Sequence, residues 1–101
     1  MSDKNEKVLC ETPTPGKQAK RIEKWKYATV RAAILKVLPR QGEGVLFQDL
    51  PDLVEAHLSD AVKTQLGSVS WYTTTVKLDL EVRGEIVRVA GSKPQRLLRN
   101  K

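Results

Sequence analysis

The chain between Gly67 and Gly84 has apolar residues at helical spacing and predicts a helix over residues 68–83. Ser68 can cap its start, because a serine hydroxyl accepts a hydrogen bond from a free first-turn amide. Gly84 can end it, because glycine enters the left-handed conformation without strain. A polar strip separates two apolar faces. One face holds Val69, Tyr72, Val76 and Leu80, the other holds Trp71, Thr75, Leu78 and Val82, and the strip holds Ser70, Thr74, Lys77 and Glu81. Such a helix is packed on both sides, or it offers one side to a partner.

Two further helices and a short strand are predicted before this helix. Apolar spacing predicts a helix over residues 22–38, and Pro39 ends it because the residue before a proline disfavours the helical conformation. The apolar run 45–47 predicts a short edge strand, and residues 48–58 predict a second helix. Residues 59–66 are ambiguous and can form one or two helical turns.

The chain after Gly84 predicts a β-hairpin over residues 85–99. A short β-branched run is followed by a turn with glycine and proline at 91–94, and the chain can then return as a second strand. Five basic residues and no acidic residue follow residue 85: Arg88, Lys93, Arg96, Arg99 and Lys101. This imbalance favours an anion-binding hairpin over one whose charges only protect an edge strand from aggregation.

Residues 1–20 predict a disordered basic tail, and residues 21–101 predict a single domain. The first segment is polar, and its two prolines push the residues before them toward extended conformations. Lysines and arginines then outnumber acidic residues from 17 to 26. Two interpretations stay open: a solvated tail, or a basic arm that follows phosphates.

Composition narrows the possible functions. The net charge of +6 favours a polyanionic partner, most commonly nucleic acid. The single cysteine, Cys10, and the single histidine, His57, cannot supply a thiolate cage or a histidine pair for a metal. We find no catalytic constellation and no phosphate-binding glycine loop, so we expect no enzyme activity, cofactor or small-molecule ligand. No signal peptide or membrane span is apparent, and we expect a cytoplasmic protein.

The predicted order is helix, strand, helix, helix, strand, strand, which is a mainly α fold with a small β-hairpin (α+β). This order resembles the winged helix-turn-helix fold over about residues 22–99. Winged-helix regulators commonly end their recognition helix with Leu-Glu, two further residues, Gly and an aliphatic residue that begins a strand. Leu80-Glu81, Val82-Arg83, Gly84 and Ile86 match that pattern. The runs 70–81 and 91–97 are similar to a small, functionally uncharacterised bacterial family of such domains.

The resemblance implies a small transcription regulator or accessory factor that binds double-stranded DNA. The helix over residues 68–83 would enter the major groove, and the hairpin, or wing, would cover phosphates. The candidates for groove contacts are Ser68, Ser70, Thr73, Thr74 and Lys77, and the candidates for phosphate contacts are Lys93, Arg96 and Arg99. These groove candidates include no Arg, Asn or Gln, the side chains best suited to bidentate base reading, so we expect modest sequence discrimination.

Two alternatives to DNA binding remain. The domain can be a protein-interaction or dimerisation module without direct DNA contact, or it can bind RNA. Trp71 is the candidate interface residue: it packs within its own domain, meets a second copy in a homodimer, or contacts a ligand or nucleic acid.

Overall fold

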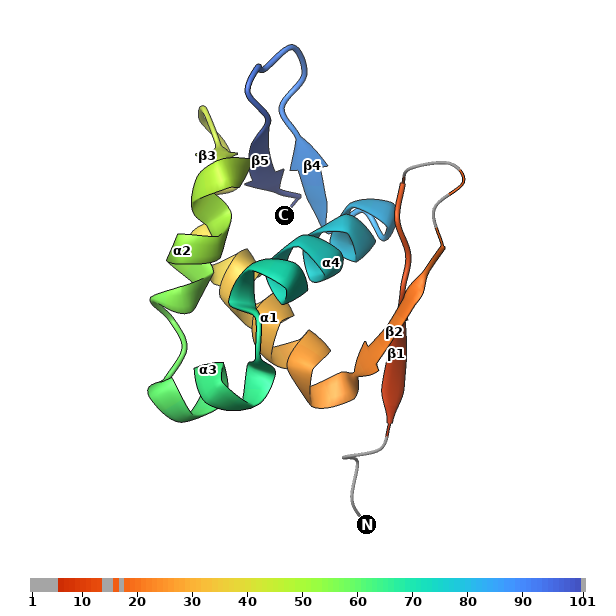
Figure 1. The fold of residues 1–101 in the computed structure, drawn as a ribbon. Coiled ribbons are helices and arrows are strands. Elements are labelled where there is room, and N and C mark those ends of the chain that lie inside the picture. Colours follow the sequence, from red (N-terminus) through yellow and green to blue (C-terminus); the bar gives the residue numbers. More distant parts are fainter. Residues whose placement is uncertain (1–5, 14–15, 17, 101) are drawn as a thin grey trace.

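A computed structural model describes residues 6–13, 16 and 18–100, and it has an α+β fold with four α-helices and two small antiparallel sheets (Figure 1). In chain order the elements are β1 (Lys7–Cys10), β2 (Lys20–Glu23), α1 (Lys24–Val37), β3 (Val45–Leu46), a 3-10 turn (Phe47–Asp49), α2 (Leu50–Glu55), α3 (Asp60–Leu66), α4 (Val69–Val82), β4 (Ile86–Arg88) and β5 (Arg96–Arg99). The predicted α+β class is confirmed. Within the described chain, no helix is long and apolar enough to cross a membrane.

The central helix is α4, which packs against each of the other three helices. The Ser68 hydroxyl accepts the Trp71 amide at 3.1 Å, and Gly84 follows the helix with a positive φ of 78°. Both predicted ends of the helix are therefore confirmed. Val76 and Leu80 are fully buried in the core. The core residues from the other helices are Val30, Ala33 and Ile34 of α1, Leu50 and Val54 of α2, and Leu66 of α3.

The predicted strand and hairpin form one antiparallel sheet in the order β3-β5-β4. Val45 pairs with Leu97, and Ile86 pairs with Arg99. Leu97 and Ile86 are buried in the core, so the base of the hairpin packs against the helices. The ambiguous segment before α4 forms α3, whose first turn is capped by the Ser59 hydroxyl.

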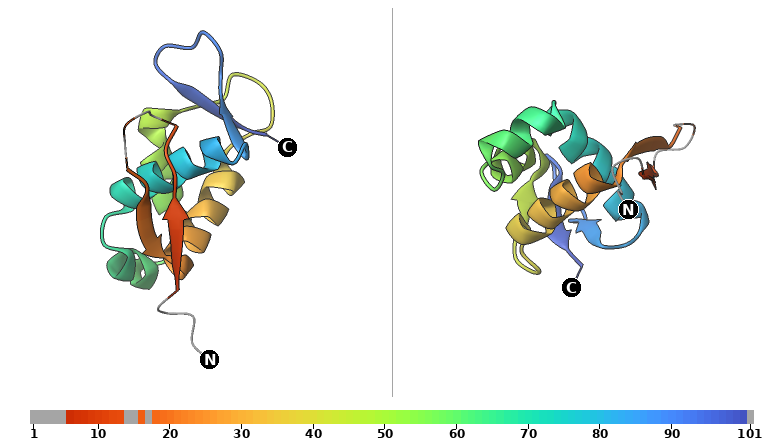
Figure 2. Two further views of the ribbon diagram at one scale, coloured as in Figure 1. Left: turned by 90° about the vertical axis from the view of Figure 1, so that its right-hand side faces the viewer. Right: turned by 90° about the horizontal axis from the view of Figure 1, so that it is seen from below.

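The expected disordered tail is wrong for residues 7–10, which form a strand. β1 pairs antiparallel with β2, and their hairpin stands beside α4 (Figure 2). Alternation puts Val8, Cys10 and Ile22 on one face of this hairpin, and β1 contacts both α1 and α4. Cys10 and Ile22 are buried there, so the segment gains enough apolar contact to order it. Residues 1–5, 14, 15 and 17 of the expected tail lie outside the described residues.

Candidate nucleic-acid interface around α4

The structure divides the five groove candidates of α4 into two sets. Ser68 and Ser70 are exposed, and Thr74 is half-buried. Thr73 and Lys77 are 0% and 2% exposed, so the prediction that they face a groove is wrong. The reason is the packing of α4 against α1 and α2, which widens its buried face until it includes positions next to Val76 and Leu80. The expected polar strip is therefore exposed only toward the start of the helix.

Lys77 belongs to a charge cluster at the base of the wing. Its Nζ lies 2.5 Å from Glu81 Oε2 and 4.4 Å from the centre of the Phe47 ring. Burial lowers the pKa of Lys77, while the hydrogen bond and charge of Glu81 oppose this shift. Glu81 also accepts a hydrogen bond from Arg88 Nε at 2.8 Å. The lysine charge is thus satisfied inside the protein and is unavailable to a phosphate.

The three wing candidates do not share one surface. Arg96 and Arg99 are three residues apart in β5, and side chains at odd spacing in a strand point to opposite faces of the sheet. Arg99 lies beside Arg31 and Glu85, around a depression between α1 and the turn after α4. Arg96 donates from Nη1 to the Gly44 carbonyl at 3.4 Å. Lys93 is exposed in the turn between β4 and β5. Lys93 and Arg96 remain candidates, whereas Arg99 is on the other side of the sheet from Arg96.

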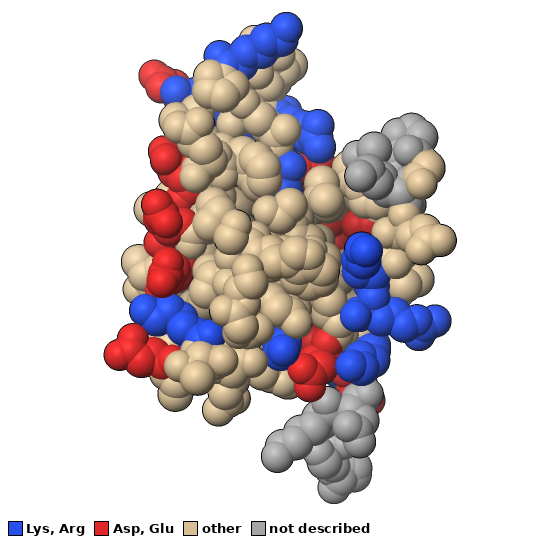
Figure 3. Space-filling view, viewed as in Figure 1, with Lys and Arg blue, Asp and Glu red and all other residues tan. Residues whose placement is uncertain are grey.

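The N-terminal hairpin contributes a second group of cations. Lys7, Lys20 and Arg21 are exposed and form no ion pair within the described part of the chain. Figure 3 shows Lys and Arg over this hairpin and over the top of the wing, a largely uncharged surface over α4 between them, and acidic residues along the α2 edge. From the sequence alone, these cations were expected to belong to a disordered tail. The signal that could have placed them is the alternation of Val8, Cys10 and Ile22, which predicts an amphipathic hairpin.

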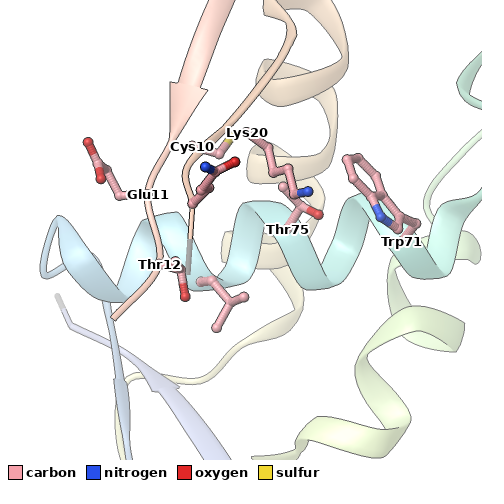
Figure 4. Close-up of a pocket in the computed structure, with 8 residues that line it drawn as sticks. Cys10, Glu11, Thr12, Lys20, Trp71 and Thr75 are labelled. Atoms are coloured by element: carbon pink, nitrogen blue, oxygen red, sulfur yellow. The ribbon is translucent and has the colours of Figure 1, made fainter. Parts of the chain in front are cut away.

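A groove of about 360 Å³ separates the N-terminal hairpin from α4 (Figure 4). Its lining residues are Cys10, Glu11, Thr12, Gln18 and Lys20 from the hairpin and Trp71, Thr75 and Leu78 from α4. Trp71 is 44% exposed and packs edge-on against Tyr72, with ring centres 4.8 Å apart. The candidate interface residue therefore borders a groove that the sequence did not predict.

Asp79 fixes the hairpin to α4 beside this groove. This carboxylate is fully buried and accepts the Glu11 backbone N–H at 2.9 Å, the Tyr27 hydroxyl at 2.5 Å and Arg83 Nε at 2.5 Å. Burial and the bond to Asp79 raise the pKa of Tyr27. Burial, followed by the nearby Asp79 charge, raises the pKa of the Cys10 thiol to about 12. The thiol is therefore neutral at pH 7 and leaves the floor of the groove uncharged.

Comparison with known proteins identifies a family but no function. A family of unknown function (DUF6958) matches residues 7–97. The chain belongs to this family. The DUF6958 match begins at the first residue of β1 and ends within β5, so it includes the N-terminal hairpin as well as the helices. No curated protein and no solved structure matches the chain. Within the described residues, no group of three or more His, Cys, Asp or Glu side chains could hold a metal ion.

Proposed function

We propose that this DUF6958 protein is a winged-helix domain that binds double-stranded DNA, as a small transcription regulator or accessory factor. The observation that carries the proposal is the position of α4, which is flanked by two β-hairpins that both bear exposed cations (Figure 1). The element order from α1 to β5, with β3 pairing to the hairpin, supports a winged-helix arrangement. In such an arrangement the last helix enters the major groove and the hairpins contact the flanking phosphates.

The solvent-accessible residues in the first half of α4 predict weak base reading. Ser70 and Thr74 present hydroxyls, which contact phosphates and base edges but form no bidentate pair with a base. Cations that can reach phosphates lie on both sides: Lys93 and Arg96 of the wing, and Lys7 and Arg21 of the N-terminal hairpin. Affinity would therefore come mainly from phosphate contacts and depend only modestly on sequence.

A salt titration of binding to random duplex DNA tests this proposal. We expect log K to fall with log[salt] with a slope of about −3 to −5, because each contacted phosphate releases about one counterion. Replacing Lys93 and Arg96 together with Gln should reduce the steepness of that slope by about 2. Arg99→Gln is the matched control. It removes a charge from the same strand but from the opposite face of the sheet, so it should leave the slope unchanged.

Two outcomes would contradict the proposal. One is a slope near zero, which would mean that phosphates are not contacted. The other is an equal loss of binding in the Arg99→Gln variant, which would place the binding surface elsewhere. Parallel titrations with single-stranded DNA and RNA separate duplex binding from RNA binding, because tighter binding to RNA would favour an RNA-binding domain.

Protein interaction is the second candidate function, and the exposed apolar residues of α4 favour it. Trp71 and Val82 are 44% and 47% exposed, near the start and at the end of the helix. An exposed tryptophan commonly anchors a protein interface. The oligomeric state of the chain tests one form of this candidate.

A further inference from the structure

The groove between the N-terminal hairpin and α4 has the size and chemistry of a small-molecule site. Its volume of about 360 Å³ is within the range of about 300–1,000 Å³ that is usual for ligand pockets. Trp71 and Leu78 give it an apolar side, and Thr75, which lies between them in the sequence of α4, also lines it. Edge-on packing against Tyr72 supports the indole from behind. A flat apolar group could therefore contact Trp71 without rearranging the core.

The charged groups around the groove favour an anion. In Figure 4, Lys20 reaches across from β2 toward Thr75 and Trp71, whereas the Glu11 side chain points away from them. Lys20 forms no ion pair with any described residue. The nearby Asp79 carboxylate is already paired with Arg83. Of the two charged residues that line the groove, Lys20 is the one whose side chain points toward Trp71 and Thr75, so a ligand against Trp71 would meet the Lys20 ammonium first.

We propose that this groove binds a small, flat, apolar molecule that carries one carboxylate. The apolar body would lie against Trp71 and Leu78, and the carboxylate would pair with Lys20. The proposal is independent of DNA binding, because neither the geometry nor its test involves nucleic acid. The groove does border Trp71, so a bound molecule would also alter the surface proposed for DNA.

The test uses 2-naphthoate as the probe, with 2-naphthamide as its uncharged counterpart, on the full chain. We expect 2-naphthoate to bind with a Kd on the order of 1 mM or lower in isothermal titration calorimetry. In ¹H–¹⁵N spectra it should shift the indole N–H of Trp71, assigned with Trp71→Phe, and the amides of Thr75 and Leu78. The indole of Trp25, which does not line the groove, should shift much less.

Two lysine variants separate the specific ion pair from general charge attraction. Lys20→Gln should weaken 2-naphthoate binding about two- to fivefold, as expected for a partly solvated ion pair, and should not affect 2-naphthamide. Lys7→Gln removes the same charge from the same hairpin but from its opposite face, so the Kd should stay unchanged. Trp71→Ala should abolish binding of both probes.

Several results would overturn the proposal. Equal Kd values for 2-naphthoate and 2-naphthamide would show that the groove does not select an anion. Equal effects of Lys20→Gln and Lys7→Gln would rule out the assigned ion pair. Absence of any shift at the Trp71 indole with about 10 mM probe would show that the groove does not bind flat apolar molecules at all.

Discussion

The buried carboxylate of Asp79 is the single side chain whose contribution to stability is most open to a direct test. Asp79→Ala leaves the Tyr27 hydroxyl and the Glu11 amide without their acceptor, while the half-exposed Arg83 can return to water. An unsatisfied buried polar group costs about 1–3 kcal/mol, so we expect the free energy of unfolding to fall by about 2–4 kcal/mol in urea denaturation.

A matched control uses an exposed aspartate, Asp60, at the start of α3. The Asp60 side chain is fully exposed, and its ion pair with Lys63 is on the surface. Asp60→Ala should leave the urea midpoint unchanged. If both variants gave the same midpoint, the buried network around Asp79 would contribute nothing to stability.

At the element scale, the N-terminal hairpin differs most from what the sequence predicted. Helices α1, α2 and α4 followed from apolar residues at helical spacing, although α1 begins at Lys24 because residues 20–23 form β2, and α3 was left ambiguous. Ser68 and Gly84 marked the ends of α4 correctly. The hairpin was missed because Pro13, Pro15 and many polar residues in the segment suggested a tail. Lys77 was misplaced for a related reason: a helical wheel shows which residues share a face, but not how much of that face the neighbouring elements cover. Such information comes from tertiary contacts, which no local pattern contains.

The reactivity of Cys10 reports whether the hairpin stays packed on α4. A rise in its thiol pKa from 9.0 to about 12 lowers the thiolate fraction at pH 8 by about 10³. We therefore expect iodoacetamide to modify Cys10 at least about 10³-fold more slowly in the folded chain than in urea. Asp79→Ala should accelerate the reaction, because it removes the bond from Asp79 to the Glu11 amide.

Because burial raises the pKa of Cys10, the free energy of unfolding also depends on pH, and the sign of that dependence follows from the direction of the shift. The folded chain keeps the Cys10 proton between about pH 9 and 12, where the unfolded chain releases it. The stabilisation from the neutral buried thiol is thus present below pH 9 and is lost as the pH rises toward 12.

The alkylation experiment has a clear contradicting outcome. If iodoacetamide modified Cys10 as fast in the native chain as in urea at pH 8, the hairpin would not remain packed on α4.

At the scale of the whole molecule, the hairpin determines how much apolar surface α4 offers to a second copy. The sequence left open whether the stripe from Trp71 to Val82 forms a dimer contact. The two ends of this stripe are 11 residues apart, or about 16 Å along a helix. Between them, the N-terminal hairpin lies beside Thr75 and Leu78 and lines a groove with them. The stripe is therefore interrupted, and neither exposed end provides the roughly 800 Å² per partner of a standard interface.

We therefore expect the chain to sediment as a monomer at concentrations up to about 100 μM in analytical ultracentrifugation, because the interrupted stripe buries too little area for a stable homodimer. Trp71→Ala should leave the sedimentation coefficient unchanged for the same reason. A wild-type dimer that Trp71→Ala converts to a monomer would contradict this prediction and would make Trp71 an interface anchor. Such a dimer would also change the DNA-binding proposal, because two symmetry-related copies of α4 would then face two half-sites. The slope of log K against log[salt] would then reflect phosphate contacts from both copies and not from one alone.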